Sequence, residues 1–280
     1  ATPTITASST APAGPSPGAW PGPVNTGEPG GTALTVVEGD QVYATAGQVI
    51  SGRDIHGYVR IRARDVTIRN SVIRGGAPRC NAAVVFVEAG ASATIQDTEI
   101  APSTRSPCLD GIWATSATLL RLNIHDTVDG VKAFDHTTLL DSSVHDLSWF
   151  DHDPNQGGGA THNDAVQTYE GNRHILLRHN TLTVGPRGNA AYQVTQDGGR
   201  ASTDLRIEGN RLDGGGCTLN LSHHGGPAPM TGITVVGNRF GRGSVYRCPI
   251  LLSTQTVLTQ NTGNVWDDTG TAIPQPQQHD

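Results

Sequence analysis

Lysine is almost absent from this chain, which contains a single lysine, Lys132, beside 18 arginines. Methionine occurs once, and Phe, Trp and Tyr together make up 5% of the residues. Of the good helix formers Ala, Leu, Glu and Lys, only the first two are plentiful, which argues against long helices. No apolar run reaches about 18 residues, so the sequence predicts no membrane-spanning helix. The net charge of −6 argues against a broad nucleic-acid-binding surface.

The chain is instead rich in glycine, with 35 glycines and four cysteines in 280 residues. This composition favours turn-rich β structure. We interpret residues 1–22 as a Pro/Ser/Thr-rich leader or linker, and residues 23–280 as a single domain with terminal caps. The first residue is Ala, which fits a secreted protein whose signal peptide has been removed, or a chain trimmed at the same point for expression.

An eight-residue pattern recurs along the chain. It begins as VTIRNSVI at 66–73 and returns at residues 93, 117, 137, 175, 205, 233 and 257, the last copy being the weakest. Spacings mostly in the twenties, with strand-like alternation, are typical of a β-solenoid. Because one coil cannot bury its apolar face alone, the coils must stack on a common core. We predict an all-β fold, a right-handed parallel β-helix of about 8 coils.

A second strand precedes each of these copies. Aligning AAVVFV (82–87), DGIWAT (110–115), DGVKAF (129–134) and later segments makes Val84, Ile112 and Val131 face inward. Strand alternation then turns a second column outward. Its members are Val85, Trp113, Lys132, Gln167, Gln193, Asn220 and Leu251. A column of small residues beside it, including Gly111, Gly130, Ala165 and Ala191, would form a shallow floor.

The four cysteines fit this alignment. Cys80 and Cys108 occupy equivalent positions in neighbouring coils, as do Cys217 and Cys248. Equivalent positions in adjacent coils lie about 4.8 Å apart, within the Cα range of a disulfide. We therefore predict the pairs Cys80–Cys108 and Cys217–Cys248, with free buried thiols as the alternative. Two disulfides indicate an oxidising, extracellular setting.

Three aspartates, Asp110, Asp129 and Asp164, align at the start of this second strand. Stacked carboxylates cannot all ionise freely. A cation such as Ca²⁺ could join them, they could share a proton, or the turns could splay them apart. Ordinary Asp-Gly turn chemistry explains Asp110 and Asp129. It explains Asp164 less well, because alanine follows it.

The longest insertion, residues 147–169, is rich in Gly, His and Asp, and long solenoid insertions usually lie on the binding face. Its end, THNDAVQ, leads into the outward column. Aromatic and amide side chains there suit an extended polysaccharide. The residues expected to bind it are Trp113, Gln167, Tyr169, Gln193, Asn220 and His223. The alternative is a solvated sheet face with an Asn/Gln ladder.

Several segments resemble actinobacterial secreted right-handed parallel β-helix proteins of the pectate-lyase-like superfamily. They are WPGPVNTGEPGGTALTVVEG (20–39), GQVISGRDIHGYVRIRARDVTIRNSVIRG (47–75), VDGVK (128–132) and THNDAVQ (161–167). The resemblance covers about residues 20–245 and is specific for the fold and the superfamily. It does not specify the substrate, because fold analogy alone does not give function.

The resemblance implies a secreted polysaccharide lyase that cleaves an acidic, uronate-containing polysaccharide by β-elimination. Lys132 is the expected base, with His162 as its rival, and Asp129 and Asp164 complete the catalytic set. Ca²⁺ held by Asp110, Asp129 and Asp164 would neutralise the uronate carboxylate. Nearby aspartates would raise the pKa of Lys132 unless a cation or the substrate offsets them.

Other functions remain open. A glycoside hydrolase could use Asp129 and Asp164, or either of them with Asp151 or Asp153. A C5-epimerase would use the same proton abstraction without elimination, and a non-catalytic carbohydrate-binding solenoid needs no acid–base pair. We expect a monomer with no nucleic-acid or membrane partner.

Overall fold

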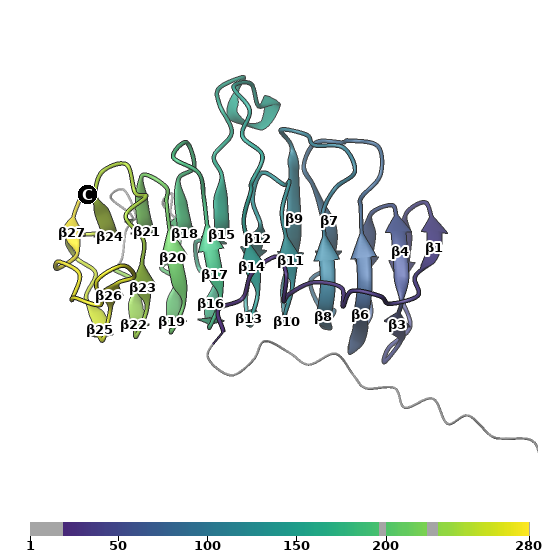
Figure 1. Cartoon of the computed structure of the whole chain (residues 1–280), viewed down its shortest axis with the longest axis horizontal. Coiled ribbons are helices and arrows are strands. Elements are labelled where there is room, and N and C mark those ends of the chain that lie inside the picture. Colours follow the sequence, from purple (N-terminus) through teal and green to yellow (C-terminus); the bar gives the residue numbers. More distant parts are fainter. Residues whose placement is uncertain (1–18, 196–199, 223–228, 280) are drawn as a thin grey trace, which may run out of the picture.

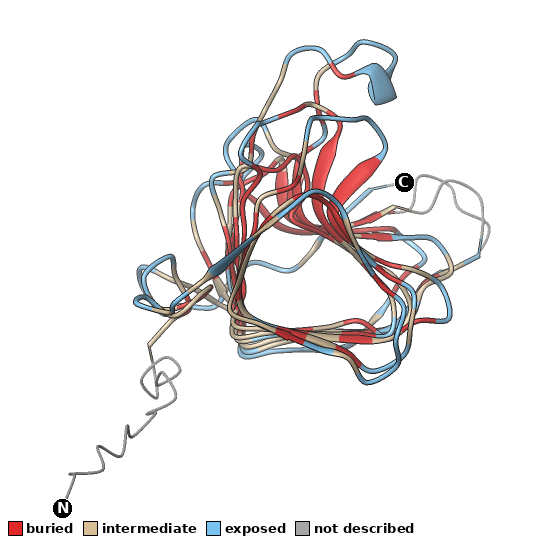
Figure 2. Cartoon of the chain, turned by 90° about the vertical axis from the view of Figure 1, so that its right-hand side faces the viewer, coloured by how far each residue is buried: buried red, intermediate tan, exposed pale blue. Residues whose placement is uncertain are grey.

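The computed structural model describes residues 19–195, 200–222 and 229–279. The chain winds into a parallel β-helix whose coils stack along one axis, as predicted (Figure 1). The end view shows the coils superimposed, with the ribbon most buried on the side of the long insertion (Figure 2). No described helix is long and apolar enough to cross a membrane.

One face of the solenoid is a sheet with ten strands in the described residues, each parallel to its neighbours. This is two more than the predicted number of coils. The two additional strands, Gln41–Tyr43 and Gln277–Gln278, are the first and the last of this sheet and were not part of the prediction. The strands are β2 (Gln41–Tyr43), β5 (Val59–Ile61), β7 (Ala82–Val87), β9 (Leu109–Ala114), β12 (Val131–Ala133), β15 (Asp164–Tyr169), β18 (Ala190–Thr195), β21 (Cys217–Leu221), β24 (Cys248–Leu252) and β27 (Gln277–Gln278).

The eight-residue copies lie in the other sheet, which bends within each copy. At the bend a residue adopts a left-handed backbone, for example Asn70 (φ 48°), Asp97 (φ 48°) and Gly209 (φ 58°), so the pattern has Asn, Asp or Gly at most of these positions. The strands are β1 (Thr35–Glu38), β3 (Val49–Ser51), β4 (Arg53–His56), β6 (Val66–Ile73), β8 (Ala93–Ile100), β10 (Ala117–Leu120), β11 (Asn123–Ile124), β13 (Thr138–Leu140), β14 (Ser143–Val144), β16 (Arg173–Arg178), β17 (Thr181–Thr183), β19 (Thr203–Glu208), β20 (Arg211–Asp213), β22 (Thr231–Val236), β23 (Arg239–Phe240), β25 (Leu258–Thr262) and β26 (Val265–Trp266).

A buried asparagine ladder follows the bend in the C-terminal coils. The side-chain amide of Asn180 donates to Asn210 (2.9 Å), Asn210 to Asn238 (3.0 Å), and Asn238 to Asn264 (3.0 Å). Each of these amides also donates to a backbone carbonyl, so the buried polar groups are paired. This internal ladder is separate from the outward row of Gln167, Gln193 and Asn220, to which the Asn/Gln-ladder alternative referred.

The core consists of aliphatic columns that run along the axis. One column is fully buried, and its neighbours pair in register between adjacent coils. Burying each such side chain contributes about 1.5–3 kcal/mol to folding. The column contains Ile68, Ile95, Leu119, Leu139, Leu177, Ile207 and Val235.

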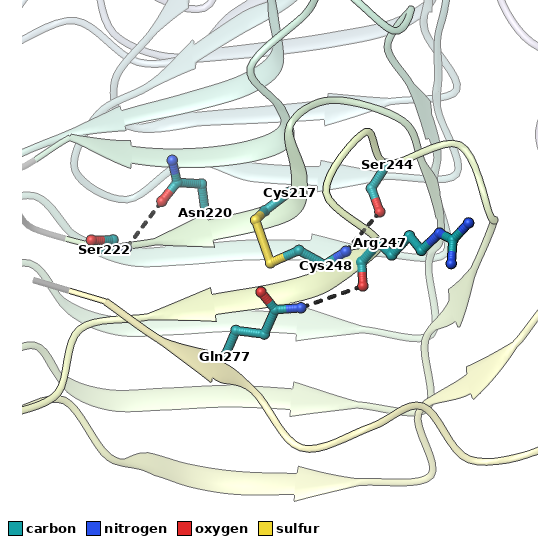
Figure 3. Close-up of a disulfide and its surroundings, with 7 residues drawn as sticks. All are labelled: Cys217, Asn220, Ser222, Ser244, Arg247, Cys248 and Gln277. Atoms are coloured by element: carbon teal, nitrogen blue, oxygen red, sulfur yellow. Dashed lines mark hydrogen bonds between the residues drawn. A yellow bond between two sulfur atoms is a disulfide. The ribbon is translucent and has the colours of Figure 1, made fainter.

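Both predicted disulfides are present. Cys80 and Cys108 have a Cα–Cα distance of 4.4 Å, and Cys217 and Cys248 one of 4.6 Å (Figure 3). Each joins neighbouring coils, as expected from the alignment. Cys217 lies directly opposite Cys248 in the sheet. The two disulfides are consistent with an extracellular protein.

The predicted alignment of the first aligned coil is wrong by one residue. Val85, not Val84, pairs with Ile112, and Phe86 pairs with Trp113. Val84 and Val85 are both fully buried, so the apolar run AAVV gave no alternation from which to choose the register. The weak copy at 257 is also misaligned, since Ile233 pairs with Leu258 and a bulge follows.

The described N-terminal segment lies across the outside of the turns before β1 begins. Trp20 stacks on His179 with ring centroids 5.3 Å apart. The amide of Gly27 donates to the carbonyl of Arg121 (2.9 Å). Gly27 has φ 84°, and a Cβ there would lie 2.7 Å from the Cβ of Asn123, so both conformation and close packing require glycine. The segment thus contacts coils distant in sequence.

Candidate functional site

The candidate site lies on the outer face of β9, β12 and β15, under the long insertion. Trp113, Lys132 and Gln167 stand side by side in register on these strands. The row continues through Gln193 and Asn220 on the next two strands. The insertion forms the tall loop above β15 in Figure 1 and contains a short 3-10 helix, η1 (Pro154–Gln156).

Lys132 forms a buried cluster with two of the three aspartates. Its Nζ lies 2.7 Å from Oδ2 of Asp110 and 3.4 Å from Oδ2 of Asp129. The side chains are 15%, 8% and 5% exposed respectively. Trp113 Nε1 donates to the same Asp110 oxygen (2.7 Å). The ammonium therefore lies between two carboxylates, with its stem beside an aromatic ring.

The three aspartates also form a ladder through the backbone of the next coil. The amide of Asp129 donates to Asp110 (3.4 Å), that of Asp164 to Asp129 (2.8 Å), and that of Ala190 to Asp164 (3.0 Å). Each carboxylate thus has a structural role at the strand entrance. This role needs only one oxygen of each, which leaves Oδ2 of Asp110 and Asp129 for the contact with Lys132.

The glycines after Asp110 and Asp129 are required by close packing rather than by a turn. A Cβ at Gly111 would lie 2.4 Å from the carbonyl oxygen of Gly130, and one at Gly130 would lie 2.5 Å from that of Ala165. The Asp-Gly turn interpretation is therefore wrong for Gly111, which lies inside β9. The small column is buried and cannot form an exposed floor, and Ala165 and Ala191 have no exposed surface.

Burial sets the charge state of the cluster. It raises the pKa of Asp129 to about 7, the charge of Asp110 adds to the rise, and Lys132 opposes it. Burial by itself would lower the pKa of Lys132, but the charges of Asp110 and Asp129 outweigh it and hold this pKa above its usual value. Lys132 is therefore an ammonium, and Asp129 is poised to exchange a proton near neutral pH.

Asp164 differs from the other two aspartates. It has no exposed surface, and burial together with the charge of Asp129 raises its pKa well above the usual range. It does not line the cavity described next. The predicted catalytic role of Asp164 would require contact with a ligand, and this position offers none.

A cavity of about 240 Å³ opens over the cluster. Asp110, Asp129 and Lys132 line it together with Trp113 and Tyr169. Its other walls come from the loop of the Cys80–Cys108 disulfide and from the insertion. They include Asn81, Pro107, Cys108, Asp153, Asn155, Gln156 and His162.

Two insertion residues in this cavity were expected to take part in chemistry. His162 is exposed, so its imidazole is accessible from the cavity. Asp153 is buried, and its carboxylate accepts from the amide of Asn155 (2.8 Å) as the N-cap of η1. Asp151 is exposed and does not line the cavity. Of the three, His162 is the side chain best placed to reach a ligand.

The aspartates do not fit the predicted calcium site. Ca²⁺ takes six to eight oxygen ligands that converge on one point. Here Asp110 and Asp129 converge on the Lys132 ammonium, and each also accepts from a backbone amide. Among the described residues no three His, Cys, Asp or Glu side chains form a group that could hold a metal ion.

The predicted sugar-binding residues lie on the same face. Tyr169 is 37% exposed and stacks on Phe134 with centroids 6.1 Å apart. Lys132 Nζ lies 5.7 Å from the Trp113 ring centre and 5.8 Å from that of Tyr169. Gln167 donates to Thr195 (3.2 Å), and Gln193 and Asn220 are partly exposed. His223 lies outside the described residues.

A second cavity, of about 370 Å³, lies beside the first. The wrong alignment of residues 82–87 did not predict it. Phe86 occupies the outward position that had been given to Val85, and its ring meets Trp113 edge-on at 5.4 Å. Three arginines, Arg60, Arg62 and Arg79, also line this cavity. Only the strand register reveals them, because the aligned second strands begin at residue 82, after Arg60, Arg62 and Arg79.

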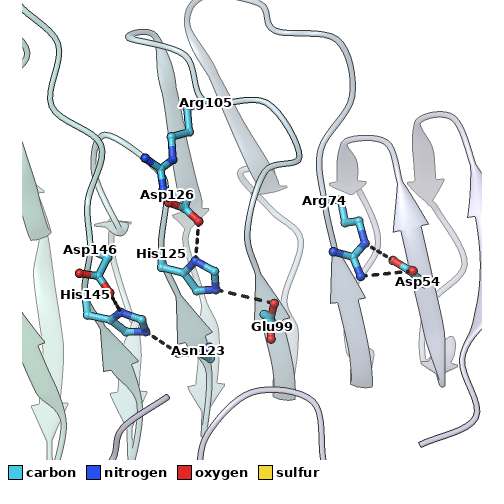
Figure 4. A network of polar contacts seen from close by, with 9 residues as sticks. All are labelled: Asp54, Arg74, Glu99, Arg105, Asn123, His125, Asp126, His145 and Asp146. Carbon is cyan, nitrogen blue, oxygen red and sulfur yellow. Dashed lines mark hydrogen bonds and ion pairs between the residues drawn. The ribbon is translucent and has the colours of Figure 1, made fainter. Parts of the chain in front are cut away.

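A separate polar network lies at the ends of β8, β11 and β14 (Figure 4). His125 lies 2.8 Å from Asp126 and 3.6 Å from Glu99, and it stacks on His145 at 5.2 Å. The contact with Glu99 is the main cause that raises the pKa of His125, and the same contact lowers the pKa of Glu99. Both nitrogens of His125 face carboxylates, so the ring holds coils together.

No family model and no curated protein matches the chain. The chain is similar to one solved structure, the crystal structure of Dettilon tailspike protein (gp208), with 10% sequence identity and a TM-score of 0.43. The match covers 83% of this chain and 60% of that chain, so this chain spans less than two thirds of its length. The assignment of the fold rests on the strand pairing described above.

Proposed function

We propose that the protein binds an extended polysaccharide along the ten-stranded sheet and cleaves it at the Asp110–Lys132–Asp129 cluster. The observation that carries the proposal is this buried cluster at the floor of an aromatic-walled cavity. A structural ladder needs one oxygen from each aspartate. It does not require the chain's one lysine to be buried between them.

The geometry favours hydrolysis by the carboxylate pair. Asp129, with a pKa of about 7, can protonate a leaving-group oxygen near neutral pH. Asp110 is the second carboxylate, held in place by Lys132 and Trp113. The two Oδ2 atoms lie 2.7 and 3.4 Å from the same atom, Lys132 Nζ. They are therefore closer to each other than the separation of about 6.5–9.5 Å that inverting enzymes use. We therefore expect retention of anomeric configuration.

β-Elimination on a uronate polysaccharide is the second candidate, and the exposed imidazole of His162 in the same cavity favours it. His162 would remove the proton next to the uronate carboxyl group, and the Lys132 ammonium would face that carboxylate. Lys132 itself is a poor base, because removing its proton would leave two carboxylates without a counter-charge.

The test is activity on a panel of neutral and uronate polysaccharides. Released reducing ends without ultraviolet-absorbing unsaturated ends indicate hydrolysis, and unsaturated ends indicate elimination. Asp129→Asn should abolish hydrolysis, because the amide cannot supply the proton. It keeps an oxygen for the Asp164 amide, so the fold should survive. His162→Gln should abolish elimination and leave hydrolysis intact.

Asp153→Asn is the matched control for Asp129→Asn. It changes another buried carboxylate of the same cavity, one that caps η1. Full activity of Asp129→Asn on every substrate that the native protein cleaves would overturn the hydrolytic role. Absence of cleavage on the panel, together with measurable glycan binding, would leave the non-catalytic carbohydrate-binding alternative.

A further inference from the structure

We infer that the cavity beside the cluster is an anion-binding subsite for a sugar that carries a carboxylate or sulfate group. It is lined by Arg60, Arg62 and Arg79, together with the rings of Phe86 and Tyr58. The inference rests on the proposed function, since the same glycan chain would cross both cavities. It assigns a role to arginines that begin three coils before Lys132.

The charges in this subsite do not balance. Arg60 and Arg62 share one carboxylate oxygen of Glu88, with Nε–Oε1 distances of 3.1 and 3.0 Å. One carboxylate cannot neutralise two guanidinium groups, so the trio carries a net positive charge. Arg79 has its own partner, Asp40, at 3.0 Å. The arginine side chains are about half exposed, which leaves N–H groups available to a ligand.

Phe86 offers apolar surface for a sugar ring, because it is only partly buried, and the Arg60 guanidinium lies 5.4 Å from its ring centre. Tyr58 is buried, and its ring supports the Arg79 guanidinium 3.7 Å from the ring centre. Rings beside guanidinium groups suit a pyranose that has one apolar face and an anionic substituent. A neutral glycan would use the rings and leave the surplus charge without a partner.

The subsite is continuous with the cleavage site. Asn81 and Trp113 line both cavities. On the sheet, Arg60, Phe86, Trp113 and Lys132 are direct neighbours on four consecutive strands. Strands lie about 4.8 Å apart, so Arg60 is about 14 Å from Lys132 along the axis. A glycan bound at the cluster and running along the axis would therefore place another of its sugars over the arginines.

The experiment measures binding of dextran, dextran sulfate and polygalacturonate to the full-length Asp129→Asn/His162→Gln variant, which prevents cleavage by either candidate reaction during titration. Its matched control uses Arg178 and Arg206, which share Glu208 on the other sheet at 3.0 and 2.6 Å with similar exposure. The double variant Arg60→Gln/Arg62→Gln is compared with Arg178→Gln/Arg206→Gln. Thermal unfolding of each variant confirms that it folds.

We expect dextran sulfate, polygalacturonate or both to bind more tightly than dextran, and the affinity to fall as salt rises. The Arg60/Arg62 double variant should bind the anionic glycan about tenfold or more weakly, because charge-assisted hydrogen bonds are lost. The Arg178/Arg206 variant should bind as before. Equal binding by both double variants, or no preference for either anionic glycan, would overturn the inference. Cleavage of a neutral glycan by Asp129 would then still stand.

Discussion

Replacing Lys132 with Met tests whether the lysine is part of a buried charge cluster or only a surface charge. Methionine keeps most of the apolar stem beside Trp113 and Tyr169 and removes the ammonium. Asp110 and Asp129 then lose the cation that lies 2.7 and 3.4 Å from them. Removing one partner of a buried ion pair costs about 3–5 kcal/mol. We expect that loss in the free energy of unfolding at pH 8.

The loss should depend on pH in a definite direction. Burial already raises the pKa of Asp129 to about 7, and Lys132 opposes the rise, so its removal raises this pKa further. A carboxyl group whose pKa is higher in the folded than in the unfolded state favours folding below the unfolded pKa of about 3.9. That contribution is lost as pH rises through the folded pKa. The variant should therefore lose less stability at pH 5 than at pH 8.

Urea unfolding followed by tryptophan fluorescence at the two pH values measures this difference. Arg206→Met is the control, because its ion pair with Glu208 is half exposed on the arginine side and should contribute at most about 1 kcal/mol. Adding Asp110→Asn to Lys132→Met should restore part of the stability by removing one uncompensated carboxylate. A loss no larger than that of Arg206→Met, and independent of pH, would refute the buried-cluster interpretation.

Three further substitutions test other parts of the structure. Asp164→Asn should change the unfolding free energy little, since burial and the charge of Asp129 raise the pKa of this carboxyl well above its usual range and so favour its uncharged form, and urea titration measures it. His125→Asn should destabilise most between about pH 4.3 and 6.5. The raised pKa of His125 contributes stability that is lost as pH rises through it, and the lowered pKa of Glu99 contributes stability that is lost on acidification, so melting temperatures across pH 4–9 should show this window. Asn210→Ala should cost about 1–3 kcal/mol for each buried group that loses its partner, measured by urea unfolding against an exposed Asn.

The sequence predicts the solenoid because each coil repeats the same physical requirement. A left-handed bend, a polar corner and two inward apolar residues recur at positions that later prove to be in register, as for Ile95 opposite Ile68. Both disulfides followed from the same logic. The register of AAVV was not predictable, because Val84 and Val85 are both fully buried and the alternation signal vanishes.

The candidate site was only partly predictable for a related reason. Strand alternation placed Trp113, Lys132 and Gln167 on one face, and the structure has them there. Alternation does not give depth, so it could not distinguish the fully buried Asp164 from the cavity-lining Asp129. Alternation also could not show that the Lys132 ammonium would lie between Asp110 and Asp129, where Ca²⁺ was predicted. How far the ammonium reaches depends on the length of the lysine side chain.

The aspartate ladder explains how a solenoid can position a carboxyl group whose pKa lies near neutral pH. Stacking brings carboxylates from successive coils together, and backbone amides of the next coil fix each of them. Burial raises the pKa values of Asp129 and Asp164, and repulsion between the fixed carboxylates, which cannot move apart, adds to the rise. Lys132 compensates at one end of the ladder only, and Asp129 lies between that end and fully buried Asp164. The proton that the proposed hydrolysis transfers to the glycan is therefore held by Asp129, where Lys132 only partly compensates the carboxylate charges and where the cavity is open.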